Sequence, residues 1–426
     1  MEKAKAGVAP ELEQLDQFHA ERFSISVPPD EIRETRTAWK KKVEGALGEM
    51  ERLETARREH RPMRRHALGK IMLVELDKKV GFSASQRERL LPIAEHLVDV
   101  PAFFPEDMLD SRDATLRPSA FFLAGANAPW KEMMEILDDA QWKRWKKACD
   151  SKTIEEEAWR RSEEVRTEAV DDGKYPLVPS EPEVLETAVS DFLHTETAPA
   201  RKRLLHTMMF RVEDVARLAE LGPESVNRLQ IAAKGATEAS LARWKEMVDP
   251  IAHDEMGDVS PANVRHRLFS IRRFIFERSP DIQPENQPVW KKAVLDELTD
   301  AQQVKLQKEL NGRNTFKISS IASLILAEFD RRVPISKAQR DTLEPIISKL
   351  EIEYAPDLEM LFREQWYYQE LAIFIPLAGV PEPELAAILS KEQLDGWNES
   401  QGFASTEKNW RIIQESHAHR ANYTAP

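Results

Sequence analysis

The chain has 426 residues, 41% hydrophobic and 32% charged, which is enough apolar material for a large core and excludes a disordered protein. The formal net charge of −13 argues against a general nucleic-acid-binding protein, because binding to phosphates needs a positive field. A single cysteine, Cys149, excludes a disulfide framework within the chain and a zinc site built from thiolates.

Residue usage predicts an all-α fold. The chain has only 14 Gly, which disfavours both phosphate-cradling glycine loops and turn-rich β architecture. Ala, Leu, Glu, Lys, Arg and Gln dominate instead, and these residues are strong helix formers. The length suggests about two to four domains.

The N-terminal part of the chain predicts one helical unit and a linker. Residues 1–30 are expected to be an irregular lead-in, after which apolar residues recur at helical spacing. Two helix starts follow, "GFSASQRERL" with Ser83 as the N-cap and "ILDDAQWKRW" with Asp138. Helical unit 1 is therefore predicted at 31–160, and the Pro, Gly and charge content of "DDGKYPLVPSEPE" predicts a linker at 161–184.

The C-terminal part continues the helical pattern. A helical middle segment is predicted at 185–281, with breaks at "LGPES" and "KGATEAS". Helical unit 2 is predicted at 282–412. The last residues, 413–426, show no periodicity and are expected to form a mobile tail.

Units 1 and 2 share sequence. "LDKKVGFSASQRERLLPI" (76–93) and "FDRRVPISKAQRDTLEPI" (329–346) are identical at eight of 18 positions, at an offset of 253 (329 − 76). Trp39 aligns with Trp290 at an offset of 251, and Trp145 aligns with Trp397 at 252. Convergence would not keep this register over about a hundred residues, so we interpret the chain as two duplicated multi-helix units that flank the middle segment.

Residues 185–280 have no counterpart ahead of unit 1. The sequence leaves two explanations open. Either a separate middle domain was inserted, or the natural chain extends upstream of Met1, which would also hide a signal peptide.

A short phrase recurs in both units. It consists of an apolar residue, a Ser, Thr or Asp cap, and a Gln three residues after the cap, followed four residues later by Leu or Trp. This order predicts a helix N-terminus in which Gln bonds back to the cap, and the later apolar residue enters the core. The glutamines are Gln86, Gln141, Gln302, Gln339 and Gln393, and the tryptophans that follow two of them are Trp145 and Trp397.

The same phrase carries a family resemblance. "LTDAQ" (298–302) resembles the LTxxQ motif of the CpxP/Spy type of bacterial periplasmic helical proteins, which are stress-linked adaptors and chaperones. Residues 205–412 also resemble a group of uncharacterised bacterial helical proteins, with "LQIAAKGAT" (229–237) in place of their LxLAGxGD-like segment. The resemblance implies a non-enzymatic adaptor, and it offers no catalytic residue.

Motifs of common enzymes are absent from the sequence. It contains no GxGxxG, GxxxxGK[ST], GxSxG or HExxH, so we assign no catalytic, cofactor-binding or metal-binding residue and expect no cofactor. No apolar run reaches the roughly 18 residues of a membrane span. The start has no apolar h-region, so the chain as given predicts a cytoplasmic protein, and a longer native N-terminus would instead place it in the periplasm or envelope.

Two segments are candidate partner-binding sites. "RHRLFSIRRFIFER" (265–278) carries Arg265, Arg272 and Arg273, which form either a partner-binding patch or ion pairs on an ordinary amphipathic helix. Trp366, Tyr367 and Tyr368 are consecutive, so one helix cannot bury all three on one side. They either anchor a partner or pack between the two units.

The sequence therefore predicts a non-enzymatic interaction, scaffold or adaptor protein of bacterial type with a protein partner. A cytosolic helical regulator, or an enzyme with an unrecognised active site, is the alternative. The sequence does not indicate an oligomeric state.

Overall fold

The computed structural model describes residues 60–99, 118–152, 182–255, 282–355, 372–399 and 403–424, together with the single positions 37, 40, 41, 43 and 358. The chain forms two compact units, Met1–Glu59 and His60–Pro426, and nearly all described residues belong to the second. The described residues form α- and 3-10 helices and contain no strand, which confirms the predicted all-α fold.

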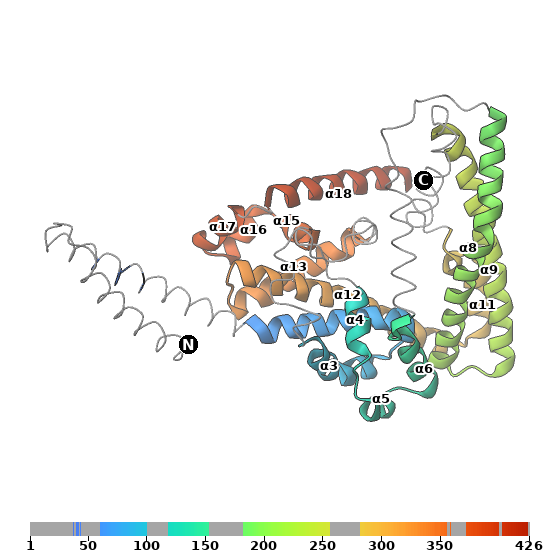
Figure 1. Cartoon of the computed structure of the whole chain (residues 1–426), viewed down its shortest axis with the longest axis horizontal. Coiled ribbons are helices and arrows are strands. Elements are labelled where there is room, and N and C mark those ends of the chain that lie inside the picture. Colours follow the sequence, from blue (N-terminus) through green and yellow to red (C-terminus); the bar gives the residue numbers. More distant parts are fainter. Residues whose placement is uncertain are drawn as a thin grey trace, which may run out of the picture. The chain divides into compact units, whose positions relative to one another are not determined.

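Figure 1 shows the helices of the second unit, coloured in chain order. A helix over residues 60–80 comes first. The elements that follow it, in chain order, are α3 (Ala84–Val98), α4 (Pro118–Gly125), α5 (Trp130–Ile136), α6 (Asp139–Ala148), α8 (Pro182–Ala219), α9 (Pro223–Glu255), η2 (Pro284–Asn286), α11 (Pro288–Glu297), α12 (Asp300–Arg332), α13 (Lys337–Glu353), η3 (Ala372–Phe374), α15 (Ile375–Ala378), α16 (Glu382–Ile388), α17 (Lys391–Asn398) and α18 (Phe403–Thr424).

The helix at 60–80 and the second half of α12 pair in antiparallel fashion. Arg64 Nε donates to Glu328 Oε1 at 2.9 Å, and Lys70 Nζ donates to Ser323 Oγ at 3.1 Å, so residue numbers rise on one helix as they fall on the other. A single hydrophobic cluster extends across the pair and includes Trp145 from the first repeat and Trp397 from the second. Segments that the sequence assigns to separate units 1 and 2 therefore share one core.

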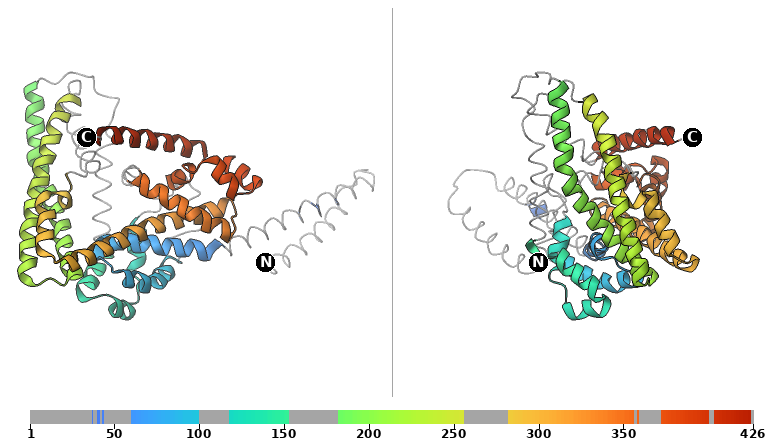
Figure 2. Two further views of the ribbon diagram at one scale, coloured as in Figure 1. Left: turned by 180° about the vertical axis from the view of Figure 1, so that it is seen from behind. Right: turned by 90° about the vertical axis from the view of Figure 1, so that its right-hand side faces the viewer.

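The middle segment forms an antiparallel pair of long helices, α8 and α9, against which α11 packs (Figure 2). Met208 and Val212 of α8, Leu229 and Ala233 of α9, and Trp290 of α11 belong to a second hydrophobic cluster. Trp290 thus packs with the middle segment although the sequence boundary at 282 assigns it to unit 2.

The break predicted at "KGATEAS" is wrong, because α9 runs through it without interruption. The small residues there serve packing. A Cβ on Gly235 would lie 3.8 Å from Val289 Cγ2 of α11, and Ala233 and Ala236 are fully buried beside it. Burial of Ala233 and Ala236 in the second hydrophobic cluster stabilises a stretch whose Gly would otherwise weaken a helix by about 1 kcal/mol.

The end of the chain, for which the sequence predicts a mobile tail at 413–426, is helical, because α18 runs to Thr424. Trp410 and Ile413 are buried, and His417 stacks on Tyr354 with ring centroids 4.7 Å apart. Positions 410, 413 and 417 form one helical stripe, which the sequence pattern conceals because its last member is a histidine. In the described part of the chain, no helix combines the length and apolarity that crossing a membrane requires.

Candidate functional site at a repeated polar junction

Each glutamine of the recurring phrase lies at the third position of a helix and completes a capping box. The cap side chain accepts the backbone N–H of the Gln, and the Gln side chain accepts the backbone N–H of the cap. The caps are Ser83, Asp138, Thr299, Ser336 and Ser390, at the starts of α3, α6, α12, α13 and α17.

The glutamine amides also connect separate helices, which the sequence does not reveal. Gln86 Nε2 donates to Gln141 Oε1 at 2.7 Å, and Gln141 Nε2 donates back to Gln86 Oε1 at 3.0 Å. Gln86 also donates to the carbonyl of Ile136 at 2.8 Å, and Gln141 donates to the carbonyl of Gly81. This reciprocal amide pair fixes the starts of α3 and α6 against each other.

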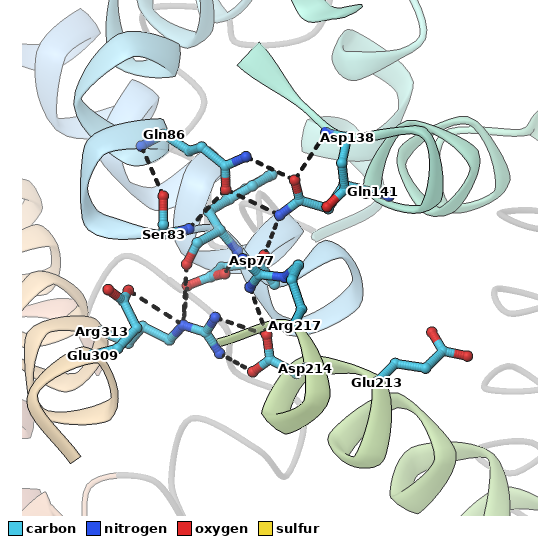
Figure 3. Close-up of polar contacts among 12 residues, drawn as sticks. Asp77, Ser83, Gln86, Asp138, Gln141, Glu213, Asp214, Arg217, Glu309 and Arg313 are labelled. Carbon is cyan, nitrogen blue, oxygen red and sulfur yellow. Dashed lines mark hydrogen bonds and ion pairs between the residues drawn. The ribbon is translucent and has the colours of Figure 1, made fainter. Parts of the chain in front are cut away.

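Charged side chains from four helices, the helix at 60–80, α3, α8 and α12, meet beside this amide pair (Figure 3). Asp214 of α8 accepts two bonds from Arg313 of α12 and one, at 2.7 Å, from Arg217. Arg87 of α3 lies 2.9 Å from Glu309, and Arg313 lies 3.8 Å from both Glu309 and Asp77. We call this set junction 1; its members are Asp77, Gly81, Gln86, Arg87, Gln141, Asp214, Arg217, Glu309 and Arg313.

Gly81 lets α8 approach junction 1 closely. Its φ of +75° is in the left-handed region, and a Cβ there would lie 2.8 Å from Asp214 Oδ1. Its carbonyl accepts a bond from Arg217 at 2.9 Å as well as the bond from Gln141. A residue with a side chain would therefore displace Asp214, the residue that attaches α8.

The pKa values of the two aspartates of junction 1 shift in opposite directions. Burial raises the pKa of Asp77, and the charge of Arg313 and the Phe82 amide only partly offset this. Burial also acts on Asp214, but its hydrogen bonds and charge contact with Arg313, and the charge of Arg217, lower its pKa overall. Asp214 is thus held as a carboxylate between two guanidinium groups, an arrangement suited to binding.

The second repeat makes the same amide contacts. Gln339 Nε2 donates to Gln393 Oε1 at 2.8 Å, and Gln393 Nε2 donates to Gln339 Oε1 at 3.3 Å. Gln339 also donates to the carbonyl of Ile388 at 2.9 Å, and Gln393 donates to the carbonyl of Pro334. Each residue stands 252 or 253 positions after its counterpart in junction 1.

The aspartate contacts recur as well. Asp77 accepts the backbone N–H of Phe82, and Asp330 accepts that of Ile335 at 2.7 Å. Arg340 lies 3.5 Å from Asp330, as Arg87 lies 3.4 Å from Asp77. We call Asp330, Pro334, Gln339, Arg340 and Gln393 junction 2. Equivalent contacts at equivalent positions are what a duplication would leave, and the duplication itself remains our interpretation.

The two tryptophans of the phrase are buried in the shared core. Trp145 packs on Phe82 and donates its Nε1–H to the carbonyl of Gly125 at 3.1 Å. Trp397 contacts the rings of Phe329 and Phe374 edge-on. The candidate partner-binding residues Arg265, Arg272, Arg273, Trp366, Tyr367 and Tyr368 lie outside the described residues.

Sequence reasoning missed the charged members of junction 1. A signal for some of them was present, because Asp77 and Arg87 are among the eight identical positions of the repeat, where they match Asp330 and Arg340. Across the ranges that the structure describes, no three His, Cys, Asp or Glu side chains gather as a metal site would require. Comparison of the chain with protein-family models, curated proteins and solved structures gives no match in any of the three.

Proposed function

We propose that this protein is a non-enzymatic scaffold or adaptor that binds a protein partner through helix docking. One observation carries the proposal: the paired glutamine amides with their Asp–Arg contact occur twice in the chain, and beside the first pair a helix from outside the repeat, α8, is held, because Arg217 donates to the Gly81 carbonyl and Asp214 accepts from Arg313. The repeated element thus works within this chain as a surface that binds a helix.

The charges of junction 1 support a binding role. Its three carboxylates, on Asp77, Asp214 and Glu309, face three guanidinium groups, on Arg87, Arg217 and Arg313. Each ionised group is neutralised by another group of the protein, which is how charges are accommodated when two protein surfaces meet.

Asp77 has the raised pKa that a catalytic acid would also have. Its oxygens, however, are taken by the Phe82 amide and lie beside Arg87 and Arg313, and only 12% of its side chain is exposed. These contacts give Asp77 a structural role, so we assign it to the junction and not to a catalytic step.

The resemblance to CpxP/Spy-type proteins supports a bacterial adaptor associated with the envelope, with the cytoplasm as the alternative compartment. Both points are tested by tagging the full chain in its native cells, cross-linking, and purifying it separately from envelope and cytosolic fractions. We expect one protein at near-stoichiometric amounts in one fraction, identified by mass spectrometry. An equally treated unrelated tagged protein is the control, and no enrichment over it in either fraction would contradict the proposal.

A further inference from the structure

Junctions 1 and 2 differ in how they are covered. Gly81 and Arg87 are buried in junction 1, whereas the equivalent Pro334 is exposed and the Arg340 side chain is 28% exposed. Gln141 is fully buried and Gln393 is only half-buried. The glutamine amide pairs of the two junctions are alike, so the difference in exposure comes from the groups that surround each pair. In junction 1 the cover is α8 and the first half of α12.

The junctions also differ in charge. In junction 1, Glu309 accepts a bond from Arg87 at 2.9 Å and from the backbone N–H of Ala84, the first residue of α3, at 3.4 Å. The position equivalent to Glu309 is residue 56 (309 − 253), which is Ala56. Among the residues that the structure describes, Arg340 pairs only with Asp330. Among the described residues, junction 2 therefore has the groups that hold Glu309 in junction 1 without an equivalent of Glu309.

An additional cation strengthens this difference. The residue equivalent to Ala84 is Lys337, which is exposed at the first position of α13. Lys337 and Arg340 are thus two cations in the first turn of α13, a 17-residue helix, whose N-terminus favours a negative charge. In junction 1 the equivalent arginine, Arg87, and the equivalent backbone N–H, that of Ala84, hold Glu309. A carboxylate is therefore the ligand that this arrangement binds within this chain.

We propose that junction 2 binds an acidic helix of a partner protein, and that Arg340 and the first backbone N–H of α13 receive one of its carboxylates. The inference rests on the proposed function and names its binding surface. The occupant carries its carboxylate where α12 carries Glu309 in junction 1. Pro334 stands where Gly81 admits Asp214 of α8, so the close approach that α8 makes to the backbone in junction 1 is not available there.

The first test measures binding of a defined probe to the full chain. The probe is a fluorescently labelled, helix-stabilised peptide of residues 300–314, the part of α12 that brings Glu309 to junction 1. We expect saturable binding that weakens about tenfold or more when the peptide carries Glu309→Gln, because a charge-assisted hydrogen bond is lost. Equal binding of the two peptides, or no saturable binding, would overturn the proposal.

Protein variants locate the binding. Arg340→Gln and Lys337→Glu should each weaken binding of the wild-type peptide, and Lys337→Glu guards against misfolding because Lys337 is exposed. Lys349→Glu is the matched control, since it makes the same charge change on the exposed side of α13, 12 residues away (349 − 337). Loss of binding in Lys349→Glu to the same extent would point to general charge attraction and refute the site.

A second test identifies the occupant in cells. A photoreactive phenylalanine replaces exposed Ala338 in the full chain, and the cross-linked residues are mapped by mass spectrometry. A cross-link to an acidic helix of another protein, lost in Lys337→Glu, supports the proposal. Cross-links within the chain or between two copies overturn it. If tagged capture finds a partner that does not cross-link at Ala338, the adaptor function stands and this binding surface fails.

Discussion

Substitution of Asp214 by Asn tests whether junction 1 is what attaches α8. The Asp214 side chain is only 4% exposed and contacts Arg313 and Arg217, so Asn removes the charge from a buried ion network while keeping the shape. Of its carboxylate partners among the described residues, Arg313 then keeps Asp77 and Glu309, each at 3.8 Å, and it still donates to the Phe82 carbonyl.

The magnitude follows from these distances. Removing one partner of a buried ion pair costs about 3–5 kcal/mol, because the remaining charge is left without its partner. Since Arg313 keeps two carboxylates nearby and Asn keeps an oxygen that accepts one hydrogen bond, we expect the lower end, about 3 kcal/mol. Local opening of α8 near residue 214 should therefore become about a hundredfold more frequent.

Hydrogen exchange measured by mass spectrometry on peptides from 205–219 reads this opening directly. Glu213→Gln is the matched control, because it makes the same change one residue away, where the side chain is 59% exposed and pairs with Arg144. A surface pair of this kind contributes about 0–1 kcal/mol. Exchange that rises no more in Asp214→Asn than in Glu213→Gln would refute the assignment of junction 1 as the attachment of α8.

Three further outcomes follow from the same contacts. Gly81→Ala should lower the free energy of unfolding, measured in urea, by about 1–2 kcal/mol or more, because Ala is strained at positive φ and its Cβ meets Asp214. Gly222→Ala is the control: a Cβ there meets nothing within 4 Å, so the free energy of unfolding should change by less than about 0.5 kcal/mol. Gln141→Ala should cost about 1–3 kcal/mol by leaving buried groups unpaired, and more than Gln393→Ala, whose side chain is half-buried; equal losses would contradict this. Because the pKa of Asp214 is lowered in the folded protein, its carboxylate stabilises the protein fully above pH 3.8, and this stability is lost as the pH falls below 3.8 through the folded-state pKa. The difference in unfolding free energy between wild type and Asp214→Asn should therefore shrink only below pH 3.8.

The all-α fold and the helix starts could be predicted because their causes are local. A capping box involves residues three apart, so Ser83 and Gln86 indicate it without knowledge of the rest of the chain. Junction 1 has no such local cause. Arg313 and Asp214 are 99 residues apart, and Arg87 and Glu309 are 222 apart, so only the tertiary fold brings them together.

The repeat nevertheless held more information than its glutamines. Most positions that are identical in two copies of a helical unit are identical because they pack in the core. A charged residue that is identical in both copies at a largely buried position therefore indicates a polar contact. Asp77 and Asp330 are such a pair, and each accepts the backbone N–H five residues further along the chain. Their partners differ, because Arg313 reaches Asp77 from α12 while His60 contacts Asp330 from the helix at 60–80. Positions 313 and 60 are themselves 253 apart, so the two contacts join equivalent positions of the repeat in opposite order. Gly81 leaves room for Asp214 of α8 at junction 1, whereas Pro334 stands at the equivalent position of junction 2.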